Sequence, residues 1–181
     1  MEDDPTTEPT GSVLLHGLPG HPLHPPLTDA TIGMLVFASA LAVLGAAGAF
    51  GDAAGKACWL ALIGGVAVAV PTAATGFADW VRLEWGSARW RTATLHLAAM
   101  STAAVLYAVA AWLQHPGYRH GDVTSGGLVF SLAGLLALTA GGWLGGAIVF
   151  VHGVRVLAGE ETSRPAEPAP ARTDQATTIG R

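Results

Sequence analysis

The chain has 181 residues, of which 51% are hydrophobic and only 12% are charged. Its length fits one domain, but a mean hydropathy of +0.45 favours a membrane protein over a water-soluble one. The net charge is -4 and the basic residues are scattered, so the sequence gives no indication of a nucleic-acid-binding surface. The single cysteine, Cys58, excludes both an internal disulfide and a thiolate metal centre held by this chain alone.

Residues 1–12 are acidic, contain Thr and Pro, and lack apolar periodicity, so we expect a disordered N-terminal tail. No basic residue precedes the first apolar run, which argues against a cleavable signal peptide and favours a retained first helix. Residues 158–181 are rich in Pro, Ala, Glu and Thr, which predicts a disordered C-terminal tail. The remaining residues, 13–157, are predicted to form one transmembrane domain.

Four apolar stretches in this domain reach the length of about 20 residues that a helix needs to cross a bilayer. They are residues 27–50, 57–77, 92–113 and 127–151. A water-soluble helical bundle is the alternative, but each of its helices would need a charged stripe, and these stretches have none. The short connection at residues 51–56 makes the first two helices antiparallel neighbours. The sequence therefore predicts an all-α integral membrane four-helix bundle with up-down-up-down topology.

Prolines and glycines mark particular points in these helices. Pro25 and Pro26 fit the first turn of a helix that begins near Leu27, where a missing amide is tolerated. Pro71 predicts a kink in the second span, with Thr72 or a neighbouring helix satisfying the freed carbonyl. Two Gly-xxx-Gly pairs in the fourth span allow a second backbone to approach closely. These four glycines are Gly141, Gly142, Gly145 and Gly146.

Positive charge predicts the orientation of the bundle. With four spans, both termini and the connection at residues 78–91 lie on one side of the membrane. That side carries four arginines close to the spans, whereas the opposite side carries only Lys56 and Arg119. Because Lys and Arg are enriched in cytoplasmic loops, we expect a multi-pass protein of the cell (inner) membrane with both termini in the cytoplasm.

The same topology brings ionisable residues from all four spans to one membrane face, and each has a structural explanation beside a functional one. Asp29 can pair with the helix dipole in the first turn, and Asp79 with a cation such as Arg155. His96 can hydrogen-bond a backbone carbonyl of a neighbouring helix, or serve as a ligand. His152 can lie at the headgroups. The full candidate set is His21, His24, His96 and His152 as cofactor ligands, with Asp29, Asp79 and Arg155 as a polar cluster.

His21 and His24 form the most distinctive pair because each precedes a proline, which biases both towards extended conformations. In a polyproline helix the rise is about 3.1 Å per residue, so their α-carbons would lie about 9 Å apart. That spacing makes it hard for the pair to chelate one ion alone. We expect them to share a site with residues of other helices, or to form a rigid cap over the bundle end.

Several segments together resemble a known family, the small bacterial four-span membrane proteins catalogued as domain of unknown function 2231. The matching segments are Gly-His-Pro-Leu-His-Pro at residues 20–25, Thr-Gly-Phe-Ala-Asp-Trp at 75–80, Gly-Trp-Leu-Gly-Gly at 142–146 and His-Gly-Val-Arg-Val at 152–156. They cover about residues 20–156. The resemblance implies a four-span membrane domain, and because some relatives are joined to a Rieske-type iron-sulfur domain, it also implies a link to membrane electron transfer.

Two functions are favoured over a third, ion or proton movement, because no span contains an acidic or basic residue near its middle to carry such a path. The first is a redox-associated membrane protein whose histidines bind haem b or a metal ion, since imidazoles from different helices of a bundle commonly hold haem. Against it, no two histidines lie deep in facing spans. The second is a non-catalytic scaffold or accessory subunit whose polar cluster closes the bundle. Its partners would be the lipid bilayer and either a second copy or a membrane redox protein. No enzyme motif is present, so we expect no independent turnover.

Overall fold

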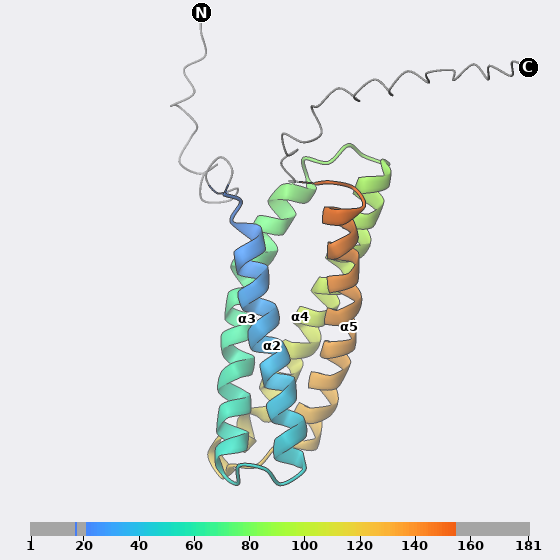
Figure 1. The fold of residues 1–181 in the computed structure, drawn as a ribbon. Coiled ribbons are helices and arrows are strands. Elements are labelled where there is room, and N and C mark those ends of the chain that lie inside the picture. The colour runs from blue at the N-terminus through green and yellow to red at the C-terminus, as the bar shows by residue number, and fades with distance from the viewer. Residues whose placement is uncertain (1–16, 18–20, 155–181) are drawn as a thin grey trace, which may run out of the picture.

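The computed structural model describes residue 17 and residues 21–154, which form a bundle of four antiparallel helices (Figure 1). The helices are α2 (His24–Ala46), α3 (Ala53–Trp80), α4 (Ala88–His120) and α5 (Ser125–Phe150). Each of them is long and apolar enough to cross a membrane, judged by length and composition alone. The predicted all-α four-helix bundle is confirmed. Both predicted disordered tails lie outside the described residues.

Three of the helices, α3, α4 and α5, are longer than the apolar stretches that predicted them, whereas α2 begins and ends earlier than its stretch at residues 27–50. The largest difference is in α4, which continues through Pro116 to His120 where the sequence predicted a loop from Gln114 onward. The reason is that Gln114 is fully buried and its amide bonds the following loop, donating to the Asp122 carbonyl at 2.9 Å. It also accepts from the Thr124 amide at 2.9 Å. A polar residue with such partners can remain in a buried helix.

Two details at helix starts differ from prediction. His24 is the first residue of α2, and Leu23 before it has helical angles of φ -81° and ψ -28°. The predicted extended conformation of His24 is therefore wrong, and the hydrogen bonds of its ring, described below, compensate for the unfavourable position before Pro25. Asp29 consequently lies beyond the first turn of α2, which contains no acidic residue. Its predicted dipole interaction in a first turn is wrong as well.

The helices contact one another in ring order, with α2 beside α3, α3 beside α4, and α4 beside α5, while a smaller contact between α2 and α5 closes the ring. A shared core lies in the half of the bundle near the α2–α3 and α4–α5 connections. Its largest members are Leu35, Leu62, Tyr107 and Leu138. In the other half, the Thr31 hydroxyl bonds the Thr72 hydroxyl within the first hairpin, and Trp80 donates to Thr94 between the hairpins. The bundle is therefore two hairpins, α2–α3 and α4–α5, that share a hydrophobic core in one half of their length.

The α2–α3 and α4–α5 connections meet at the end of the shared core. The Gly55 amide of α3 donates to the Gly121 carbonyl at 2.9 Å, and the Gln114 side chain reaches the Gly55 carbonyl at 3.3 Å. Gly121 ends α4 with a φ of +88°, a conformation that suits glycine. These contacts fix one end of the bundle, and the candidate ligands His21, His24, His96 and His152 lie at the opposite end.

Candidate functional site: two histidines held between paired helices

His24 joins α2 to α3. Its Nδ1 lies 3.1 Å from both the Thr72 carbonyl oxygen and the Thr75 hydroxyl. A carbonyl oxygen only accepts, so Nδ1 is the donor in the bond to Thr72. The ring also packs on Gly76, where an added Cβ would lie 2.7 Å from Cε1. His24 therefore needs both the α3 carbonyl and the adjacent glycine.

His96 joins α4 to α5 in the same manner. Its Nδ1 lies 2.8 Å from the Gly141 carbonyl oxygen, so Nδ1 is again the donor, and Nε2 is the nitrogen that this bond does not use. An added Cβ at Gly145 would lie 3.1 Å from Cε1 of the ring. The sequence left open a carbonyl hydrogen bond or a ligand role for His96. The hydrogen bond is present, and it leaves the ligand role open because it uses the other nitrogen.

The two hairpins thus repeat one arrangement. In each, a histidine of the first helix donates to a carbonyl of the second helix, and its ring packs on the glycine four residues further along, as with Thr72 and Gly76. The first hairpin differs in a second acceptor, since Thr75 adds a hydroxyl 3.1 Å from Nδ1 of His24. Metal-binding histidines in proteins usually donate one ring nitrogen in this way, which fixes the orientation of the other.

The two histidines also lie at similar depth. The Trp80 indole nitrogen donates to the Thr94 hydroxyl at 3.0 Å and so ties the end of α3 to the second turn of α4. Measured from that bond, at about 1.5 Å per residue, the level of His24 beside Gly76 is about 6 Å deeper and His96 is about 3 Å deeper. One imidazole from each hairpin therefore lies within a few Å of a common level.

The remaining predicted site residues lie elsewhere or are only partly described. His152 is half-buried after α5, and its Nε2 lies 2.9 Å from the Thr92 hydroxyl, one turn nearer the bundle end than His96. His21 and Asp29 are exposed, and Asp79 is half-buried in the last turn of α3. Arg155 lies outside the described residues, so its pairing with Asp79 stays a prediction. Within residues 21–154 no group of three or more His, Cys, Asp or Glu side chains could hold one metal ion.

The four glycines of α5 lie on two different faces of the helix. Gly141 and Gly145 face α4, since a Cβ on either would meet Met100 or His96. Gly142 and Gly146 face outward, with nothing near Gly142 and only the Phe150 ring at 4.0 Å from a Cβ on Gly146. Gly141 and Gly145 therefore make room for the Met100 and His96 side chains of α4, and the close approach of a second backbone at either pair stays a prediction.

A buried polar layer in the middle of the bundle was missed from the sequence. The Ser39 hydroxyl of α2 lies 2.9 Å from the Tyr107 hydroxyl of α4, and Ser39 also reaches the Ser131 carbonyl of α5 at 3.4 Å. The Ser131 hydroxyl is fully buried and has no hydrogen-bond partner among the described residues. Single serines inside long apolar stretches were the available signal, because a polar residue at that depth avoids lipid.

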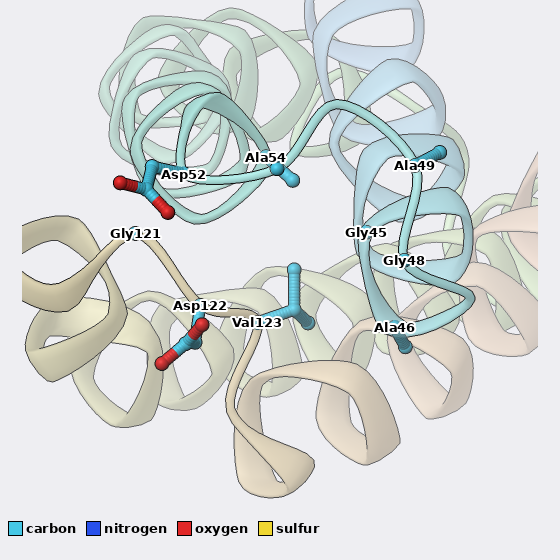
Figure 2. A pocket seen from close by; sticks show the side chains of 10 residues that line it. Gly45, Ala46, Gly48, Ala49, Asp52, Ala54, Gly121, Asp122 and Val123 are labelled. Atoms are coloured by element: carbon cyan, nitrogen blue, oxygen red, sulfur yellow. The ribbon is translucent and has the colours of Figure 1, made fainter.

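A hollow at the far end of the bundle lies between the two connections (Figure 2). The Val123 side chain points into the space beside Gly45 and Ala54, and an added Cβ on Gly45 would lie 2.6 Å from the valine. The carboxylates of Asp52 and Asp122 lie at one edge of this hollow and belong to exposed residues. Small residues and a valine line most of the space, which indicates packing between loops.

A family model described as "Predicted membrane protein (DUF2231)" matches residues 20–158. The matched segment includes all four helices and both histidine arrangements. No curated protein and no solved structure matches this chain.

Proposed function

The chain belongs to the DUF2231 family of predicted membrane proteins, and we propose that it is a redox-associated protein whose His24 and His96 ligate a haem b between the two hairpins. The observation that carries this proposal is the matched anchoring of the two imidazoles. Each donates Nδ1–H to a carbonyl of the paired helix, and this is the way in which ligating histidines are usually held. Two neutral imidazoles from different helices of a bundle are a common axial ligand set for haem.

The arrangement of the hairpins supports the same proposal. The shared core occupies one half of the bundle, whereas in the other half the hydrogen bonds from His24 to Thr72 and from His96 to Gly141 each lie within one hairpin. A planar cofactor between the hairpins would supply the contacts that the side chains provide in the other half. A haem held there by His24 and His96 would allow the protein to exchange electrons with a redox partner in the same membrane.

The absorption spectrum of the detergent-purified protein, produced in cells supplied with iron and haem precursor, tests this proposal. We expect a Soret band that is strongly reduced in His24→Ala and in His96→Ala. His115→Ala is the matched control, because His115 lies at the opposite end of α4 and packs on Trp59 with ring centroids 5.5 Å apart. A colourless, metal-free protein, or a band that survives both substitutions, would overturn the proposal.

A second candidate is a non-catalytic scaffold or accessory subunit, because the same hydrogen bonds close each hairpin without any cofactor. His24 ties α2 to α3, His96 ties α4 to α5, and His152 ties the end of α5 to the start of α4. The exposed Gly142 and Gly146 would then contact a second copy or another membrane protein. This candidate predicts that His96→Ala lowers thermal stability while the spectrum remains featureless in both proteins.

For localisation we propose the cell (inner) membrane with both termini in the cytoplasm. The support is the charge asymmetry, since Arg82, Arg89 and Arg91 lie at the α3–α4 connection and Lys56 and Arg119 at the other end. A reporter inserted at Gly86 should be active on the cytoplasmic side, and one at Gly48 on the outside. The reverse pattern would contradict the orientation.

A further inference from the structure

A second hollow lies beside the α3–α4 connection, at the same end of the bundle as the histidines. Its volume is about 490 Å³, and it is lined by residues of the connection, the first turn of α4 and the segment after α5. The lining residues are Arg82, Leu83, Glu84, Ser87, Ala88, Arg89 and His152. Side chains from segments far apart in the sequence therefore surround one open space.

The charge of this hollow favours an anion. Arg82 and Arg89 are exposed, and Glu84 supplies the single carboxylate among the lining residues, so two guanidinium groups face one negative charge. His152 adds an imidazole whose Nε2 is held by Thr92 at 2.9 Å. Guanidinium groups match phosphate oxygens through two parallel hydrogen bonds, which makes arginine the usual side chain for binding phosphate.

Three tryptophans lie in or beside the connection that lines this hollow. The centroids of Trp85 and Trp90 are 4.2 Å apart, and the centroids of Trp80 and Trp90 are 6.1 Å apart. Tryptophan is enriched where lipid headgroups meet the hydrocarbon layer. The arginines alternate with these tryptophans along the same connection, so we expect the hollow to lie near the depth of the lipid phosphates.

We propose that this hollow binds a phosphate-type anion through Arg82 and Arg89. Basic pockets at the ends of membrane helices bind anionic headgroups, and free phosphate has the same chemistry. The site is separate from the haem proposed above, since it uses neither His24 nor His96, and it would persist in a protein that binds no haem.

Native mass spectrometry of the full-length protein from mild detergent tests the lipid source, with phosphatidylglycerol and zwitterionic phosphatidylcholine as probes. We expect phosphatidylglycerol to be retained preferentially, and the double variant Arg82→Gln/Arg89→Gln to bind it about tenfold more weakly. Arg119→Gln is the control, since Arg119 is an exposed arginine at the opposite end of α4. The double variant should elute as the wild-type protein does on size exclusion, because both residues are exposed.

Titration with inorganic phosphate, followed by tryptophan fluorescence, separates the two sources. Binding of phosphatidylglycerol that excess phosphate does not displace identifies a lipid site. A saturable fluorescence change with phosphate that the double variant loses, without lipid retention, identifies a free-anion site. If neither probe binds, or if Arg82→Gln/Arg89→Gln and the wild type bind both equally, the proposal is wrong.

Discussion

Single hydroxyl groups in the middle of the bundle differ in whether they have a partner. Ser39 bonds the Leu35 carbonyl at 3.0 Å and the Tyr107 hydroxyl at 2.9 Å, so both hydroxyls of that pair are satisfied. The Ser131 hydroxyl is equally buried and has no partner among the described residues. An unpaired buried hydroxyl costs free energy that a paired one does not. Removing the Ser131 hydroxyl should therefore not destabilise the protein, whereas removing the Tyr107 hydroxyl should.

Ser131→Ala should leave the protein as stable as the wild type or raise its stability by about 1 kcal/mol, because it removes an unsatisfied hydroxyl. Thermal unfolding in detergent, followed by circular dichroism, measures this. The control is Thr139→Ala, an exposed residue of the same helix whose hydroxyl bonds the Leu135 carbonyl. A clear loss of stability specific to Ser131→Ala would show that this hydroxyl has a partner in the membrane.

Tyr107→Phe should lower the free energy of unfolding by about 0.6 to 1 kcal/mol. The ring keeps its packing, including its contact with Gly134, while Ser39 loses one of its hydrogen bonds. Ser39 retains the Leu35 carbonyl, which keeps the loss small. The same unfolding experiment checks it, and the double variant Tyr107→Phe/Ser39→Ala should cost less than the sum of the two single changes.

Where helices meet, glycine positions decide how closely they approach. A Cβ on Gly55 of α3 would contact the Asp122 carbonyl oxygen and lie 2.5 Å from the Gly121 carbonyl carbon. Both are backbone atoms of the opposite connection and cannot rotate away. Gly33 of α2 has nothing within 4 Å of an added Cβ. The two glycines therefore differ in their surroundings although both are helical.

Gly55→Ala should destabilise the bundle by about 2 kcal/mol or more, because the α4–α5 connection would have to move and the Gly55 amide would lose its bond to Gly121. Gly33→Ala should be neutral or slightly stabilising, since alanine favours a helix by up to about 1 kcal/mol over glycine. Thermal unfolding of the two variants side by side measures the difference. Equal effects would mean that the connections do not pack as described.

The existence and type of the four helices could be predicted from hydropathy alone, because a membrane span needs a long apolar run. Their ends could not, since α4 extends to His120 only through hydrogen bonds that Gln114 makes with a later loop. The histidines were identifiable as polar residues near helix ends. Their partners were not, because the carbonyls of Thr72 and Gly141 face them only at one rotation of the paired helix. Sequence periodicity does not show how each helix is rotated about its own axis relative to its neighbour.

For the whole molecule, the two hairpins are held together chiefly by one shared core. Leu35, Leu41 and Leu62 of the first hairpin pack there with Tyr107 and Leu138 of the second. The covalent link between the hairpins is the turn after α3, in which Glu84, Trp85 and Gly86 are exposed. If packing in the core, rather than the turn, holds the two hairpins together, the turn can be cut without separating them.

A protease site inserted between Trp85 and Gly86 tests this. After cleavage in mild detergent, the α2–α3 and α4–α5 hairpins should still elute together, because packing of the core persists while only chain connectivity is lost. Combining the cut with Leu62→Ala should promote separation, since Leu62 is fully buried and its loss leaves a cavity that costs about 2 to 5 kcal/mol. Hairpins that separate on cleavage alone would show that the turn is required. If the cut hairpins stay together even with Leu62→Ala, contacts at the histidine end, where the proposed cofactor would lie, contribute more to the association of the hairpins than the core does.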